Sequence, residues 1–402
     1  MSEWKKVKLG DICERVTSGG TPKANVSSYY YPPTIPWLKT KEVNYCRITE
    51  TENYISEEGL NNSSAKLIAP NSVIIAMYGQ GDTAGRVAIN KIPLTTNQAC
   101  CNLTIDKSKA DYDFIYYQLC TLYNKMVSLK AGAAQPNLNA QIIKNLEVLL
   151  PSLSTQHCIA TTLSRYDSLI ENYQKQIKLL EEAAQRLYKE WFVDLRFPGH
   201  ETTKIVDGVP EGWEKKATGE VGTVITGKTP STAQKENYGG TIPFITIPDM
   251  HSGIYPNSSQ FLSDFGANSQ SGKFIPKDSL MVSCIGTAGL VCISKEQCQT
   301  NQQINSLILN DKTLLYYMYF TFMSLKKHLN NIGSNGATMT NVNKSKFESM
   351  EVILPQANLI NIFNSVVEES FSKIKNLSSQ IRLLTEARDR LLPKLMSGEI
   401  AV

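Results

Sequence analysis

The sequence contains no long hydrophobic run and no cysteine pair at metal-binding spacing. No stretch of about 18 apolar residues occurs, so we expect no membrane span, and the polar N-terminus does not have the pattern of a signal peptide. The nine cysteines form no C-x-x-C pair, which disfavours a zinc knuckle and suits buried, reduced thiols. These absences predict a cytoplasmic protein without a structural metal.

The chain also has only a small excess of positive over negative charge. The 402 residues carry a net charge of +4, which is too weak an excess to establish a nucleic-acid partner. The stretch 213–354 contains no arginine, so bidentate arginine, the commonest guanine-reading side chain, is missing there. Direct base reading in that stretch would depend on lysine, asparagine and glutamine.

No complete catalytic motif is present. The run 222–229 fits the phosphate-loop pattern G-x-x-x-x-G-K-[ST], but its β-branched interior favours a strand and Pro230 follows at once. The run YPPT at 31–34 lacks both the amide or carboxylate and the aromatic residue of an amino-methyltransferase motif. The four histidines are too widely spaced to form a metal pair. We therefore expect no catalytic site, no metal and no cofactor in this chain.

What the chain does contain is a large internal repeat. The matching segments keep the same order in both copies, and from residue 83 onward their offset stays at 204 residues. A period this long indicates a duplicated domain pair. The matches include Thr21-Pro22 with Thr229-Pro230, Thr83-Ala84-Gly85 with Thr287-Ala288-Gly289, and Thr96-Asn97-Gln98 with Thr300-Asn301-Gln302.

Each copy divides into a globular part and a helical part. Short β-rich runs such as 73–78 are separated by Gly, Pro and Asn, and a helix is expected over 112–129, so the globular part is predicted to be mixed α/β. The predicted boundaries are 1–150 and 199–354 for the globular domains and 151–198 and 355–402 for the helical regions.

Each helical region carries an apolar seam with heptad spacing. Apolar residues step by four and three from Ile159 to Trp191 and again from Phe363 to Leu395, where Ser370 and Arg388 interrupt the pattern. Neither seam is expected to stay in water. The alternatives are that each helix packs only on its own domain, or that the helices pair as an antiparallel coiled coil around a pseudo-two-fold axis. We favour pairing, through Leu163, Ile170, Ile177, Leu180, Leu187, Val367, Ile374, Ile381, Leu384 and Leu391.

Several segments resemble the specificity subunits of type I restriction-modification systems, and the likeness covers the whole chain. The run LPSLSTQHCIA at 150–160 is similar to the start of the family's first conserved helix, and WFVD at 191–194 to its end. RLLPKLMSGEI at 390–400 is similar to the family's C-terminal ending. VTSGGTP at 16–22 and VITGKTP at 224–230 are similar to the starts of its target-recognition domains. The run 355–359 departs from the pattern, because the usual glutamine before the isoleucine is missing.

The resemblance implies an α+β fold with two mixed α/β target-recognition domains, separated by two long spacer helices. It implies a partner in double-stranded DNA, with one half-site of a bipartite, asymmetric target for each domain. It also implies two methyltransferase (M) subunits and restriction/translocase (R) subunits as partners, which would hold the methyl donor and ATP. Two other functions stay open: a structural adaptor with two protein-binding heads, and an ATP-using enzyme that depends on Lys228.

Three loop sets that recur in both copies are the predicted DNA contacts. Glycines at 78–86 and 285–289 would let the backbone approach a phosphate, or would only form tight turns. Side-chain amides at 96–98 and 300–302, and at 135–137 and 340–341, would read adenine or cap turns. Lysines in both domains would contact phosphates. The predicted residues are Lys39, Lys41, Tyr78, Gln80, Arg86, Asn97, Gln98, Gln135, Asn137, Lys228, Thr287, Asn301, Gln302, Thr340 and Asn341.

Overall fold

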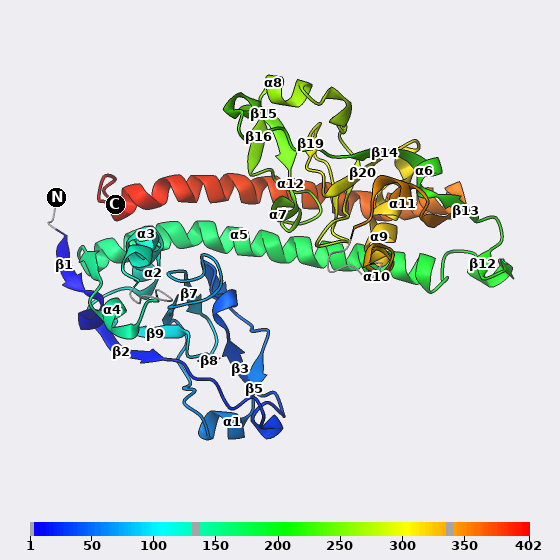
Figure 1. The fold of residues 1–402 in the computed structure, drawn as a ribbon. Helices are drawn as coiled ribbons and strands as arrows, with labels where there is room; N and C mark the ends of the chain where they lie inside the picture. Colours follow the sequence, from blue (N-terminus) through cyan, green and yellow to red (C-terminus); the bar gives the residue numbers. More distant parts are fainter. Residues whose placement is uncertain (1–3, 131–136, 335–340) are drawn as a thin grey trace. The chain divides into compact units, whose positions relative to one another are not determined.

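The computed structural model describes residues 4–130, 137–334 and 341–402 (Figure 1). The chain divides into two compact units, one formed by residues 1–169 with 384–402 and the other by residues 170–383. Each unit therefore contains one globular part and a portion of both long helices. The finer boundaries at 150, 198 and 354 stay predictions.

The first unit is built on a five-stranded sheet in the order β2-β9-β6-β7-β4, in which β4 alone joins its neighbour in parallel. A three-stranded sheet, β5-β3-β8, and a two-stranded sheet, β1-β10, complete the unit. The strands are β1 Lys5–Lys8, β2 Cys13–Ser18, β3 Ile35–Leu38, β4 Cys46–Ile48, β5 Tyr54–Ile55, β6 Val73–Ala76, β7 Val87–Asn90, β8 Thr95–Thr96, β9 Cys100–Ile105 and β10 Glu147–Leu150.

The second unit repeats most of this arrangement in sheets ordered β14-β20-β17-β18, β16-β15-β19 and β13-β21, and adds the hairpin β11-β12. Its larger sheet has four strands, because no strand of that sheet corresponds to β4. Both three-stranded sheets contain one antiparallel and one parallel pair. The sequence repeat is therefore a structural repeat. The strands are β11 Ile205–Val206, β12 Val209–Pro210, β13 Glu214–Ala217, β14 Gly222–Thr226, β15 Tyr238–Ile245, β16 Gln260–Leu262, β17 Leu280–Ser283, β18 Val291–Ile293, β19 Gln299–Thr300, β20 Ile304–Leu309 and β21 Glu351–Leu354.

Short helices connect these strands. The single helix predicted over 112–129 is wrong in detail, because the chain forms two helices that meet at Leu122, where the backbone N–H bonds to the carbonyls of both Gln118 and Leu119. Such a tightened last turn ends a helix. The helices are α1 Glu57–Asn61, α2 Tyr112–Thr121, α3 Tyr123–Ser128 and α4 Ala140–Lys144, then α6 Thr218–Val221, α7 Ile247–Met250, α8 Asp264–Asn268, α9 Leu315–Ser324, α10 Lys326–Ser334 and α11 Lys344–Glu348.

Two long helices follow the globular parts. Helix α5 spans Leu153–Tyr188 and continues as a π-helical turn, Lys189–Val193, while α12 spans Ala357–Met396. Both begin a turn or more before the seam, close behind Pro151 and Pro355. The departure of the run 355–359 from the family pattern therefore does not prevent the second helix from forming.

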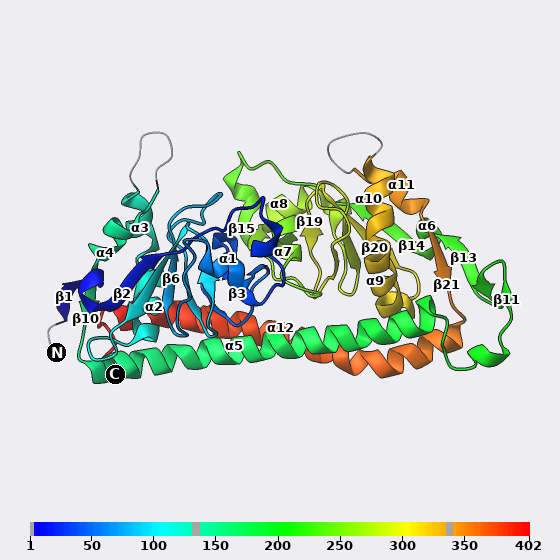
Figure 2. The same cartoon turned by 90° about the horizontal axis from the view of Figure 1, so that it is seen from below.

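The two helices run antiparallel. In the first unit, Ile159 and Leu163 near the start of α5 share a hydrophobic core with Leu395 near the end of α12. In the second unit, Phe192, just beyond the end of α5, packs on Phe363 near the start of α12, with ring centroids 5.1 Å apart. The ribbon views show α5 and α12 side by side and opposite in direction (Figure 1, Figure 2). Residues of the globular parts belong to the same two cores. Each seam therefore packs on the other helix as well as on a globular part. This confirms the predicted pairing and excludes packing on the helix's own domain alone.

The predicted pairing residues are all at least half-buried. Leu163, Ile170, Val367 and Ile374 are buried, and the remaining six lie at intermediate exposure. Such a stripe is what a paired amphipathic helix requires. The individual partner of each residue across the helix pair stays a prediction. The half-buried six are Ile177, Leu180, Leu187, Ile381, Leu384 and Leu391.

The cysteine thiols and the polarity of the helices can be compared with the predictions made from the sequence. All nine cysteines are free, and five of them are buried. Burial raises the pKa of the Cys101 thiol to about 12, so this group stays protonated. Cys158 is exposed, which the prediction of buried thiols did not foresee. Across the described residues, every helix is too short or too polar to cross a bilayer.

Candidate nucleic-acid interface

Three of the predicted contact segments converge in the first unit. The residue that follows β6, Met77, donates its backbone N–H to the carbonyl of Ala99 at 2.8 Å and accepts from the N–H of Leu138 at 3.0 Å. These two bonds bring the neighbouring residues Tyr78, Gln98 and Asn137 to one end of the sheet. We call this group the three-loop junction.

The second unit builds the same junction from equivalent residues. Cys284 donates its N–H to the carbonyl of Gln303 at 2.8 Å and accepts from the N–H of Val342 at 2.9 Å. Ile285 also forms an antiparallel bridge with Asn341. Residues that are about 20, 40 and 60 positions apart in the sequence therefore meet in the same way in both units.

A Thr-Pro segment closes each junction. The Thr21 hydroxyl donates to the Gln98 side chain, and the Thr229 hydroxyl donates to Gln302 Oε1 at 2.6 Å. The sequence prediction quoted these threonines for the internal repeat and for the family resemblance, but omitted them from the site. The signal that could have found them is the recurrence of Thr-Pro and Thr-Asn-Gln in both copies.

A glycine in each unit allows the chain before the Thr-Pro segment to lie close to the Thr-Asn-Gln loop. A β-carbon at Gly19 would overlap the carbonyl oxygens of Thr96 and Asn97, and one at Gly227 would overlap those of Thr300 and Asn301. No larger residue fits either position without moving the backbone. The glycine before the Thr-Pro segment is therefore part of the junction in each unit.

The glycine-rich loop of the first unit is held by its own polar groups. Arg86 donates to Asn44 Oδ1 at 3.0 Å and pairs with Asp82, and this hydrogen bond lowers the pKa of the Asp82 carboxyl below its ordinary value. The Tyr123 hydroxyl donates to the Asp82 carbonyl at 2.8 Å. Gly81 and Gly85 both have positive φ angles, so tight turns are present. The side chain of Gln80 is exposed at this loop.

The predicted amides fall into two groups. Asn97 accepts from the Cys100 thiol at 3.3 Å, and Asn301 donates to Gln303 Oε1 at 3.1 Å, so both half-buried asparagines serve local turns. Gln98 and Gln302 are exposed, and in each the carbonyl oxygen accepts from a threonine hydroxyl. This orientation leaves the Nε2 donors directed away from that bond.

The predicted cations differ in their surroundings. Lys39 donates to Asn53 Oδ1 at 3.0 Å and lies over the Trp37 ring, and Lys41 pairs with Glu52. Lys228 and Thr287 are exposed. Within the described part of the chain, the Lys228 ammonium group has no ion-pair partner. Gln135 and Thr340 lie outside the described residues.

The phosphate-loop pattern at 222–229 is a strand followed by a turn. Residues 222–226 form β14, which pairs with β20 from Gly222 to Thr226. The Gly222 Cα faces the Ile308 carbonyl closely enough to leave no room for a side chain. This confirms the strand expected from the β-branched residues. In the ranges that the structure describes, His, Cys, Asp and Glu form no group that could hold a metal.

A buried charged cluster in the first unit was not predicted. Arg47 on β4 bonds to Asp167 of α5 at 2.8 Å and to Asp113 of α2 at 3.0 Å, and Arg388 of α12 bonds to Asp167 at 2.7 Å. Tyr117 also donates to Asp167. Burial alone would raise the pKa of the Asp167 carboxyl, but the hydrogen bonds from Arg47, Tyr117 and Arg388 outweigh it and hold the pKa below its ordinary value.

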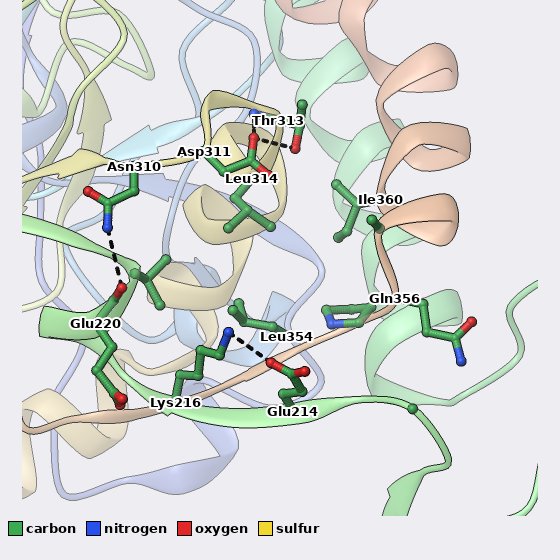
Figure 3. Close-up of a pocket in the computed structure, with 14 residues that line it drawn as sticks. Glu214, Lys216, Glu220, Asn310, Asp311, Thr313, Leu314, Leu354, Gln356 and Ile360 are labelled. Atoms are coloured by element: carbon green, nitrogen blue, oxygen red, sulfur yellow. Dashed lines mark hydrogen bonds and ion pairs between the residues drawn. The ribbon is translucent and has the colours of Figure 1, made fainter.

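Each unit also has a pocket beside its two-stranded sheet. In the second unit a pocket of about 350 Å³ lies between β13, β21 and the start of α12 (Figure 3). Its wall includes the ion pair of Glu214 with Lys216 and the hydrogen bond from Asn310 to the Glu220 carbonyl. A pocket of about 600 Å³ beside β1 and β10 is its counterpart in the first unit. Neither is lined by a predicted DNA-binding residue.

Comparison with known proteins agrees with this architecture. Residues 1–182 and 210–383 match the family described as type I restriction modification DNA specificity domain. The chain is 30% identical to the type I restriction enzyme HindI specificity subunit of Haemophilus influenzae over the full length of both. It is also 30% identical to the MjaIX specificity subunit of Methanocaldococcus jannaschii, over 100% of this chain and 94% of the relative.

A solved structure shares the fold. The type I restriction-modification S subunit from M. genitalium superposes with a TM-score of 0.62 at 16% identity, covering 98% of this chain and 96% of that one. The chain belongs to the type I restriction-modification specificity-subunit family. The relatives are described as specificity subunits, which is the family that the sequence predicted.

Proposed function

We propose that this chain recognises a bipartite, asymmetric sequence in double-stranded DNA for a type I restriction-modification complex, with one half-site read by each unit. The observation that carries the proposal is the three-loop junction, which is assembled by the same backbone bonds in both units. A shared framework with different side chains suits two readers of the same kind of ligand with different sequence preferences.

The difference between the junctions supports an asymmetric target. Tyr78 stands where the second junction has Ile285, and the arginine of the first glycine-rich loop has no counterpart because the stretch 213–354 lacks arginine. Glutamine and asparagine amides can pair with adenine in the major groove, whereas arginine prefers guanine. The two half-sites should therefore differ in base composition.

The long helices support a divided target. The 36 residues of α5 correspond to about 54 Å at about 1.5 Å per residue. This length equals about one and a half turns of duplex DNA, because one turn measures about 34–36 Å. Readers held apart by such helices would contact two half-sites and leave the bases between them unread.

The partners follow from the same proposal. Two M subunits and R subunits would dock on this chain and would supply the methyl donor and ATP, so the chain itself would need no cofactor. Its DNA partner would be reached in the cytoplasm. The predicted site residues then act by placing DNA and not by catalysis.

Salt-dependent DNA binding distinguishes this proposal from a protein-binding adaptor. The purified chain should bind a bipartite DNA duplex, and the affinity should fall steeply as salt rises, because phosphate contacts release counterions. An adaptor with two protein-binding heads would show no such binding. The rival ATP-using enzyme predicts nucleotide binding that Lys228→Ala abolishes, whereas the DNA-recognition proposal predicts none.

A further inference from the structure

The two helices meet through different chemistry in the two units. In the first unit, Arg388 of α12 bonds to Asp167 of α5 at 2.7 Å, and the Asp167 side chain is only 7% exposed. The repeat offset of 204 residues relates this pair to Ala184 and Phe371. Both are buried in one hydrophobic core of the second unit. An ion pair in one unit thus corresponds to a small and a large apolar side chain in the other.

The ion pair belongs to a cluster of charges. Asp167 pairs with both Arg47 and Arg388, and Asp113 pairs with Arg47. The Asp167 and Arg47 side chains are buried, those of Asp113 and Arg388 are partly exposed, and the exposed Asp389 also pairs with Arg388. Removing one member of such a group leaves a buried charge without its partner, which destabilises a fold strongly. The cluster therefore requires arginine at position 388 of the neighbouring helix.

The apolar pair of the second unit combines a large side chain with a small one. Phe371 is fully buried and stacks on Tyr316 with ring centroids 4.2 Å apart, and Ala184 is 4% exposed. A large side chain of one helix and a small one of the other share this core, whose interior is expected to be close-packed. A charged residue at position 184 would be placed in this aromatic core.

Self-pairing would break both arrangements. If α5 paired antiparallel with a second copy of α5, Asp167 would meet Ala184, and the cluster would lose one of its two arginines. If α12 paired with a second α12, Arg388 would meet Phe371 and have no buried carboxylate opposite. We infer that Asp167, Ala184, Phe371 and Arg388 make each repeat pair with the other repeat and reject a second copy of itself.

The inference predicts which substitutions would remove the preference of each repeat for the other. In the double variant Asp167→Phe with Arg388→Ala, each helix carries one phenylalanine and one alanine at the paired positions. Each helix is then complementary to itself as well as to its partner. The two repeats should lose their preference for each other.

The test uses the full chain with a protease site inserted at the exposed turn Asp207-Gly208 between β11 and β12. The folded protein is cut, unfolded, and refolded as a mixture of two differently tagged preparations. Affinity capture followed by mass spectrometry then counts which fragments are recovered together. This measures pairing without requiring either fragment to fold alone.

The unchanged protein should give only complexes of the first fragment with the second. The double variant should also give first-with-first and second-with-second complexes in comparable amounts. Arg388→Ala alone should permit second-with-second complexes while first-with-first complexes stay absent, which keeps the test decisive if the double variant does not refold. The matched control, Glu182→Ala with Arg186→Ala, removes an exposed ion pair of α5 and should change nothing. Self-pairing by the unchanged protein, or strict mixed pairing by Arg388→Ala, would overturn the inference.

Discussion

The Thr229 hydroxyl donates to Gln302 Oε1 at 2.6 Å, and Thr21 donates to Gln98 in the same way in the other unit. This bond fixes the orientation of an exposed amide whose position in the sequence repeat is shared. Because the amide oxygen is held by the threonine, the Nε2 group is available to an acceptor on a ligand. The threonine–glutamine pair is therefore a structural feature of both units and also a candidate contact with DNA.

Single glutamine substitutions should affect one half-site each. Gln80→Ala should weaken binding to the half-site of the first unit and Gln302→Ala to that of the second. The loss should be about 1–3 kcal/mol, the usual cost of one base contact. The measurement is a binding titration on duplexes that carry one correct and one scrambled half-site. Gln174→Ala on the exposed face of α5 is the control. An equal loss on all sequences would instead assign that glutamine to the phosphate backbone.

Gly227→Ala should destabilise the second unit. The added β-carbon would overlap the carbonyl oxygens of Thr300 and Asn301, so the Thr-Pro segment must move away from the junction. Overpacking of this kind costs about 1–3 kcal/mol. Thermal unfolding should show a lower midpoint for this variant. Gly272→Ala is the matched control in the same unit, because its β-carbon would meet open space. Equal midpoints for both variants would show that the close approach is not required.

Asp167 should make the stability of the first unit depend on acid pH. Its folded-state pKa lies below the ordinary value of about 3.9, so its contribution is present above that pH and is lost as the pH falls through the folded value. Asp167→Ala should cost about 3–5 kcal/mol at pH 7, as expected for breaking a buried ion pair. The difference from the unchanged protein, followed by chemical unfolding, should shrink towards pH 3. Glu201→Ala, an exposed change, should show no such trend. A constant difference across this range would contradict the stabilising role of the Asp167 ion pairs.

Glu181 should make the stability of the fold depend on pH in the opposite direction to Asp167. Burial raises the pKa of this α5 carboxyl to about 7, so its neutral form is favoured in the folded state. Stability should be greatest below the unfolded pKa and should fall as the pH rises through about 7. Glu181→Gln should therefore raise the free energy of unfolding at pH 8 by about 1–2 kcal/mol, after solvent screening of this half-buried group, and raise the thermal midpoint accordingly. At pH 4 the two proteins should unfold together, and a shift of equal size at both pH values would contradict the raised pKa.

Much of the fold could be predicted from the sequence, because it depends on patterns that local physics makes visible. The repeated segments predicted two equivalent units, and the heptad spacing predicted long paired helices. The antiparallel direction was predicted from a pseudo-two-fold axis between the two copies. The break at Leu122 was missed because the apolar pattern continues through a turn that only the backbone hydrogen bonds define. Arg388 was recognised as a polar interruption of the seam, but its partner Asp167 lies 221 residues away and belongs to no motif.

The site was predictable as segments and not as contacts. The sequence identified the three loops of each junction, but it could not show that Met77 and Cys284 join them through backbone bonds. It also could not separate Asn97, which serves a local turn, from the exposed Gln98 beside it. That distinction depends on side-chain direction within one tight turn.

The most direct test of two units reading two unlike half-sites is a map of methylated adenines in the host genome, with and without this gene. We predict one methylated motif of two different halves, separated by a fixed number of unread bases, that disappears when the gene is deleted. A continuous or palindromic motif, or a methylation pattern that does not change on deletion, would contradict the account.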